Sequence, residues 1–105
     1  MSASSAAVLD ALGDKTRRCI LERVADGPVA VGVLADQLPI SRPAVSQHLR
    51  VLKDAGLVVE SVAGTRRLYR INQVGFMALH DYLDRFWMRA LADYKEIVER
   101  EGDEA

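Results

Sequence analysis

The sequence predicts a mainly α-helical protein that also contains a small β-hairpin. Apolar residues recur at helical spacing over most of the chain, whereas residues 57–71 contain two short β-type runs on either side of a glycine. The 105 residues are 50% hydrophobic and 28% charged, a balance that allows one modest core and argues against disorder. We therefore expect one domain, 1–105, with four helices, two strands and a last helix in that order.

The first two helices are predicted from their apolar spacing and their end signals. Residues 5–12, SAAVLDAL, form a short run rich in small residues that Gly13 ends. Asp14 then stands where a second helix needs an N-cap. The buried face of this second helix should contain Ile20, Leu21 and Val24.

Residues 31–55 predict a helix-turn-helix. The run 31–38, VGVLADQL, has the spacing of a compact amphipathic helix, and a tight turn follows it. Ser41 is a good N-cap for a second helix, which runs from Arg42 to about Ala55. Its buried side chains should be Val45, Leu49 and Leu52.

Residues 57–72 predict a hairpin directly after this pair of helices. The runs LVVES and RRLYRI flank Ala63-Gly64-Thr65, a turn between two short strands. The turn end and the second strand carry Arg66, Arg67 and Arg70. A helix-turn-helix followed by such a basic hairpin is the arrangement of a winged helix-turn-helix.

The last helix, residues 73–100, is predicted to be a dimerisation helix. At 1.5 Å per residue it would be about 40 Å long, more than so small a domain can cover. Its wide apolar stripe would be covered either by its own core, if the helix folds back, or by a second subunit, which we expect. The predicted interface of this homodimer comprises Leu9, Leu12, Leu79, Leu83, Phe86, Trp87 and Ala90.

Charge is unevenly distributed along the chain. The net charge is −1 and the isoelectric point is near 6.1, which alone would argue against a nucleic-acid partner. Residues 41–70, however, contain six bases and two acids, a balance of +4, whereas residues 71–105 contain four bases and eight acids, a balance of −4. The basic middle third of the chain therefore predicts a surface for a polyanion.

The helix at residues 42–55 carries polar side chains opposite its buried face. Arginine, glutamine and serine are residue types that hydrogen-bond to base edges, and the wing arginines suit phosphates or a narrow minor groove. Solvation of an exposed helix is the plainer interpretation of Arg50 and Lys53, and His48 could equally make a structural hydrogen bond. The candidate DNA-binding residues are Arg42, Pro43, Ser46, Gln47, His48, Arg50, Lys53, Arg66 and Arg67.

Three segments resemble the ArsR/SmtB family of bacterial repressors. They are DKTRRCILERVADGP, LADQLPISRPAVSQHLRVLKDAGLV and GTRRLYRI. The resemblance implies a cytoplasmic homodimer, paired through its first and last helices, that represses transcription at a partly palindromic DNA operator and often controls its own gene. It also implies that Ser46, Gln47 and Arg50 read bases.

The sequence departs from the metal-sensing members of that family. The segment VGVLADQL lacks a ligand cluster, and the last helix offers only His80, Asp81 and Asp84. His80 and Asp84 share a helical face but are weak candidates, because tight zinc binding needs three or four suitable ligands. We therefore expect no metal or other cofactor. Any effector would be a small organic molecule in an apolar pocket near Phe76, Phe86 and Trp87.

Other functional classes are less well supported by the residues. Ser46 and His48 are adjacent on a helix but face different directions, so no nucleophile–base pair indicates an enzyme. The single cysteine, Cys19, is expected to be a packing residue, with a redox-responsive repressor as the alternative. A winged helix used only for protein contacts would not need a basic wing.

Membrane insertion and secretion are also not expected. No apolar run approaches the roughly 18 residues that span a bilayer, and the start MSASSAAVLDALGD lacks the basic region of a secretory signal. The expected location is the cytoplasm.

Overall fold

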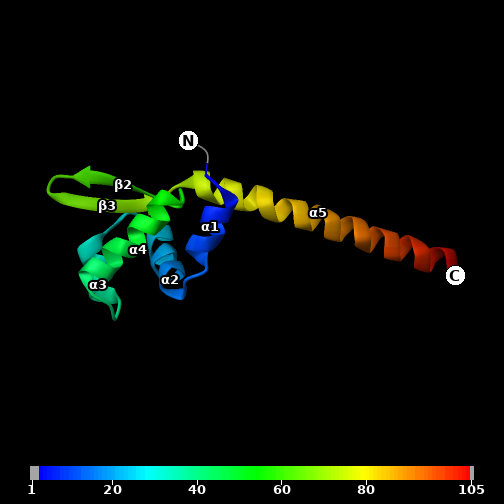
Figure 1. Ribbon diagram of the computed structural model, residues 1–105, viewed down its shortest axis with the longest axis horizontal. Helices are drawn as coiled ribbons and strands as arrows, with labels where there is room; N and C mark the ends of the chain where they lie inside the picture. The colour runs from blue at the N-terminus through cyan, green and yellow to red at the C-terminus, as the bar shows by residue number, and fades with distance from the viewer. Residues whose placement is uncertain (1–2, 105) are drawn as a thin grey trace.

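The computed structural model describes residues 3–104 and has the predicted mainly α-helical, winged helix-turn-helix fold (Figure 1). Predicted helix starts agree within a residue, and the last helix continues beyond the expected residue 100. The elements in chain order are α1 (Ser5–Leu12), α2 (Lys15–Ala25), β1 (Val29–Ala30), α3 (Val31–Gln37), α4 (Arg42–Asp54), β2 (Val58–Ala63), β3 (Arg66–Ile71) and α5 (Gln73–Glu104).

Local hydrogen bonds explain why the first helices begin and end where they do. The Asp14 carboxylate accepts from the backbone N–H of Arg17 at 2.9 Å, and the Ser41 hydroxyl accepts from that of Ala44 at 3.3 Å, so both predicted N-caps are confirmed. The Nε of Arg17 donates to the carbonyl oxygen of Ala11 at 2.7 Å. This bond satisfies a carbonyl at the end of α1 and fixes the corner between α1 and α2.

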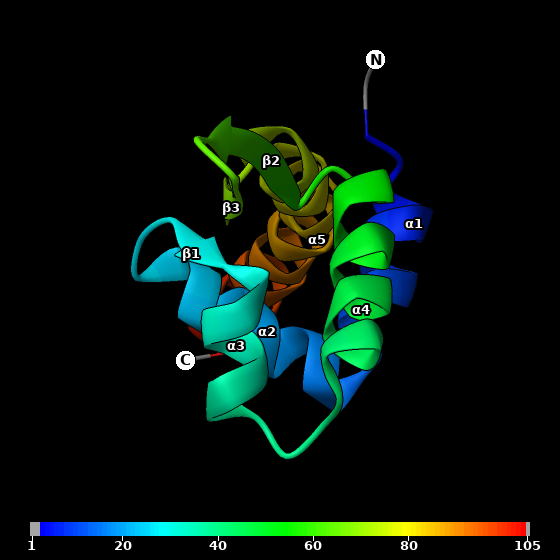
Figure 2. The same ribbon diagram turned by 90° about the vertical axis from the view of Figure 1, so that its left-hand side faces the viewer.

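The core lies between α1, α2, α3, α4 and the base of the wing, as the end-on view of Figure 2 shows. The predicted buried faces of α2 and α4 are confirmed, because every residue named for them is buried. The fully buried large side chains are Val8, Ile20, Val24, Leu34, Val45, Leu49, Leu52, Leu57 and Val58. This packing holds α4 firmly on one side and leaves its other side to solvent.

The sheet has three antiparallel strands in the order β1-β3-β2, whereas the sequence predicted a two-stranded hairpin. The additional strand β1 contains only Val29 and Ala30, which pair with Tyr69 and Leu68. Two residues are too short to show an alternating pattern, so this strand is defined only by its pairing with β3. It joins the wing to the segment that leads into α3.

Only the first part of α5 packs on the rest of the domain. Phe76 and Leu79 pack against the core, whereas every described side chain from Leu83 onward is exposed. The helix then extends away from the other elements, and the longest dimension of the molecule is 68 Å (Figure 1). The alternative in which α5 folds back over its own core is therefore wrong.

Two glycines bring the end of α4 close to the start of α5. The backbone N–H of Gly75 donates to the carbonyl oxygen of Gly56 at 2.8 Å, and Gly56 has a φ of 80°. A Cβ at position 75 would lie 2.6 Å from that oxygen, so a larger residue would force the two segments apart.

No helix of the described residues is long and apolar enough to cross a membrane.

Candidate nucleic-acid interface

The exposed face of α4 carries most of the predicted DNA-binding residues. Three fully buried side chains hold the opposite face against the core. His48 is half-buried, so it stands at the edge of this surface. The exposed candidates on this helix are Arg42, Pro43, Ser46, Gln47, Arg50 and Lys53.

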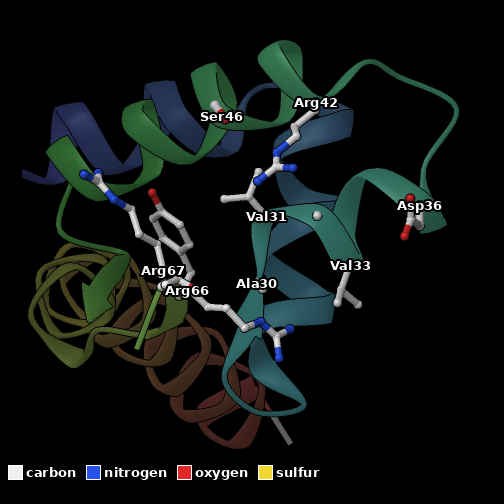
Figure 3. A pocket seen from close by; sticks show the side chains of 11 residues that line it. Ala30, Val31, Val33, Asp36, Arg42, Ser46, Arg66 and Arg67 are labelled. Atoms are coloured by element: carbon white, nitrogen blue, oxygen red, sulfur yellow. The ribbon is translucent and has the colours of Figure 1, made fainter. Parts of the chain in front are cut away.

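A hollow of about 620 Å³ lies between the first half of α4, the start of α3 and the wing (Figure 3). It brings together four of the predicted DNA-binding residues from two distant parts of the sequence, namely Arg42, Ser46, Arg66 and Arg67. Figure 3 shows that Arg67 extends toward α4 while Arg66 extends away from it. The two wing arginines therefore present their charges to different sides of the wing.

A second hollow, of about 360 Å³, lies beside the last turns of α4. It contains the predicted residues Arg50, Lys53 and Arg67. Its remaining lining residues, Asp54, Glu60 and Tyr69, were not among the candidates. The predicted cations thus form a band that follows α4 from its first turn to its last, on the side of the wing.

Glu60 is the centre of the polar contacts in this second hollow. Its Oε1 lies 2.8 Å from Lys53 Nζ, and its Oε2 accepts from the Tyr69 hydroxyl at 2.9 Å and lies 3.6 Å from Arg67. The hydrogen bonds from Lys53 and then Tyr69 lower the pKa of the Glu60 carboxyl. Burial raises the pKa of Tyr69, and its bond to Glu60 raises it further.

The remaining candidates on α4 lie outside both hollows. Pro43 and Gln47 are exposed beyond them, and His48 is near α2. Asp14 has a lowered pKa, chiefly through the backbone N–H of Arg17 and to a smaller degree through the nearby charges of Arg17 and His48. His48 therefore lies near enough to the start of α2 to influence Asp14, and it is the least exposed of the nine candidates.

The contributions of α3 and of the wing turn to this surface were not predicted from the sequence. Val31, Gly32, Val33, Asp36 and Thr65 line the first hollow. The signal for Thr65 was present, because it is next to the wing arginines in the predicted turn. The start of α3 had no polar pattern that could have indicated it.

The chemistry of this surface is that of binding to an extended polyanion. Guanidinium and ammonium groups bind phosphate oxygens, while serine, glutamine and arginine on an exposed helix can reach base edges. Among the side chains of residues 3–102, no group of three or more from histidine, cysteine, aspartate or glutamate could hold a metal ion.

Comparisons with known proteins decide the family. A helix-turn-helix domain family matches residues 12–61. The HTH-type transcriptional regulator Rv2034 of Mycobacterium tuberculosis is 58% identical over 94 residues, which cover 90% of this chain and 88% of that protein. The ArsR-like transcriptional regulator of Rhodococcus sp. RHA1 has a similar solved structure, with a TM-score of 0.74, 34% identity and coverage of 89% and 91% of the two chains. The chain belongs to the ArsR/SmtB family.

This ArsR/SmtB-family protein is therefore a DNA-binding transcriptional regulator and not an enzyme. Another similar solved structure is that of Mb0332 from Mycobacterium bovis, described as a homodimeric winged helix-turn-helix DNA-binding domain. It is 34% identical, with a TM-score of 0.61 and coverage of 84% of this chain and 77% of that one. The family and fold predicted from the sequence are confirmed.

Proposed function

We propose that this regulator represses transcription by binding a partly palindromic DNA operator as a homodimer. Each subunit inserts α4 into the major groove of one half-site, and the wing follows the adjacent backbone. The observation that carries this proposal is the exposed polar face of α4, which continues into the cationic band shared with Arg66 and Arg67. One such operator lies in the promoter of the regulator's own gene.

The exposed residues divide into two proposed roles. Ser46, Gln47 and Arg50 contact base edges, because they project from the middle of α4, which enters the groove most deeply. Arg42, Pro43, His48, Lys53, Arg66 and Arg67 lie around them and contact the phosphate backbone or its immediate surroundings.

The exposed part of α5 supports the homodimer. Leu83, Phe86 and Trp87 are 51%, 54% and 63% exposed, which is unusual for large apolar side chains on a continuous stripe. Leu9 and Ala90 are exposed as well, whereas Leu12 and Leu79 are partly buried against the core and can offer only their remaining surface. The homodimeric state of Mb0332 is consistent with this pairing.

Two antiparallel copies of α5 that cross at Ala90 would be complementary to each other in both shape and charge. The small side chain of Ala90 allows close approach at the crossing, and Leu83 would lie opposite Ile97 of the second copy, each seven residues from the centre. Asp84 and Lys95 lie on one edge of the stripe, about three turns apart. Antiparallel pairing would place Asp84 of each copy beside Lys95 of the other.

The predicted effector pocket is only partly supported. A hollow of about 510 Å³ on α5 contains Phe86 and Trp87, but Phe76 does not line it because Phe76 packs on the core. The hollow lies on the proposed dimer stripe, so the second subunit would cover it. We therefore propose that operator binding requires no effector.

Alanine variants test the two roles on DNA. Gln47→Ala and Arg50→Ala should each weaken operator binding by about 1–3 kcal/mol and relax base preference. Arg66→Ala should instead weaken binding to all duplexes. It should also reduce the slope of log affinity against log salt concentration by about one unit per subunit. Arg100→Ala, near the end of α5, is the matched control and should change neither the affinity nor this slope.

The measurement is fluorescence anisotropy with a duplex enriched from a random library by the wild-type protein, at several salt concentrations. Wild-type affinity and salt slope in all three interface variants would contradict the proposed DNA surface. A reporter gene driven by a bound promoter tests the sign of regulation, since repression requires higher expression when the regulator is deleted.

A further inference from the structure

Glu60 is an acidic residue placed among the cations of the proposed DNA surface. It is the third residue of β2 and pairs in register with Tyr69 of β3. Its side chain is 24% exposed, and both carboxylate oxygens are engaged by neighbouring groups. A carboxylate close to a phosphate backbone is repelled by it, so this position needs an explanation beyond DNA contact.

The contacts of Glu60 hold two of the cations assigned to DNA. Lys53 comes from the last turn of α4 and Arg67 from β3, and both pair with this one carboxylate. Tyr69 is buried, so the hydrogen bond from its hydroxyl fixes the carboxylate in place. By contrast, within residues 3–102 neither Arg42 nor Arg66 forms an ion pair with an acidic side chain.

We propose that Glu60 determines DNA selectivity by competing with phosphates for Lys53 and Arg67. Non-specific binding depends almost entirely on phosphate contacts and therefore on every cation that can reach the backbone. Operator binding gains additional free energy from base contacts. Cations without an acidic partner, such as Arg42 and Arg66, supply most of its phosphate contacts, and Lys53 and Arg67 contribute less. Glu60 thus weakens non-specific complexes more than the operator complex.

This proposal rests on the proposed DNA binding and is tested with Glu60→Gln. The amide keeps the size of the side chain and can still accept from Tyr69, but it removes the negative charge that holds the two cations. Affinity for a mixed-sequence duplex should rise about fivefold per subunit at 0.15 M salt, with a steeper salt slope, because about one more phosphate contact forms. Affinity for the library-enriched duplex should rise less. The ratio of the affinity for the enriched duplex to the affinity for the mixed-sequence duplex should therefore fall.

Two further variants make the test specific. Glu99→Gln removes the same charge from an ion pair with Lys95 on distal α5, where the two side chains are 3.9 Å apart, and should leave both affinities unchanged. Tyr69→Phe keeps all charges but removes the bond that fixes Glu60, so it should act in the direction of Glu60→Gln with a smaller effect.

The outcomes separate this inference from the proposed function. If the wild-type protein prefers its enriched duplex but Glu60→Gln leaves mixed-sequence affinity unchanged or lower, only the role of Glu60 is overturned. An equal increase with Glu99→Gln would overturn it as well, because net charge alone would then explain the effect. If the wild-type protein binds neither duplex, the proposed function is overturned together with this inference.

Discussion

The α4–wing surface and the part of α5 from Leu83 onward are both exposed, but they expose opposite chemistry. The first presents cations, three of which, Arg42, Arg50 and Arg66, have no acidic partner in the described part of the chain. The second presents a stripe of large apolar side chains such as Phe86 and Trp87. A polyanion is complementary to the first surface and a second copy of the chain to the other, so each surface lacks a different partner.

The two regions also differ in what supports them. α4 has an N-cap and three fully buried side chains, so its shape is fixed before any DNA is bound. Within residues 89–102, the distal half of α5 has only its own backbone hydrogen bonds and the exposed ion pairs Lys95–Glu99 and Arg100–Glu96. Such pairs contribute about 0.3–0.5 kcal/mol each, so this half should depend on dimerisation for stability.

The largest expected effect comes from placing a charge on the apolar stripe. Phe86→Glu or Leu83→Glu should give monomers in sedimentation, because the proposed interface would bury an unpaired carboxylate. Operator affinity should then fall by about two to four orders of magnitude, since the two half-sites would no longer be bound together.

Met88→Glu is the matched control for the stripe variants. Met88 is 58% exposed, close to the 54% of Phe86, but it projects from a different side of α5. This variant should remain dimeric, and a dimeric Phe86→Glu protein would show that the stripe is not the interface.

The next largest effect is expected where the two regions join. Gly75→Ala should destabilise the protein by about 1–3 kcal/mol in urea unfolding, because the new methyl group would collide with the backbone of Gly56. Gly102→Ala lies on the same helix with nothing within 4 Å and should instead be neutral or slightly stabilising. Equal effects of the two substitutions would argue against a close contact at Gly75.

A smaller effect should follow titration of Asp14, the N-cap of α2. Its folded pKa is lowered from the model-peptide value of 3.8, so its stabilisation is complete above about pH 4 and is lost as the pH falls through the folded pKa. Asp14→Asn keeps an N-cap without this titration. The wild-type protein should have a higher free energy of unfolding in urea than Asp14→Asn, and this difference should shrink as the pH is lowered below 4. A difference that does not change with pH would show that the Asp14 charge is not its cause.

Metal ions are expected to have no effect on operator binding. His80 is exposed on α5, and its nearest acidic partner is Asp81 at 3.7 Å, too few ligands for tight zinc binding. Operator affinity should be the same with chelator and with micromolar zinc, in the wild-type protein and in His80→Ala. Release of DNA by zinc that His80→Ala abolishes would make α5 a sensor as well as a dimerisation helix.

The parts of the fold that depend on local sequence could be predicted. Apolar spacing and the caps at Asp14 and Ser41 identified the helices, and the same spacing identified the buried face of α4. Strand β1 could not be predicted in this way, because its two residues are a strand only through their pairing with β3.

The candidate site was predicted in composition but not in its internal contacts. Residue types and the basic middle third indicated the cations of α4 and the wing. The hairpin turn at Gly64 would also have placed Glu60 opposite Tyr69, had the register been worked out from Ala63 and Arg66. The third partner, Lys53, comes from α4, and only the tertiary arrangement brings it to this carboxylate.

The contact between Gly56 and Gly75 has a consequence for the length of the operator. It joins the end of the reading helix to the start of the dimerisation helix through a backbone hydrogen bond of 2.8 Å, with no side chain from either residue between them. In the proposed homodimer this junction fixes the distance between the two α4 helices. The spacing of the half-sites, about 10 base pairs or a multiple of it, would then be set by main-chain geometry. Substitutions on the apolar stripe would instead change the strength of dimerisation.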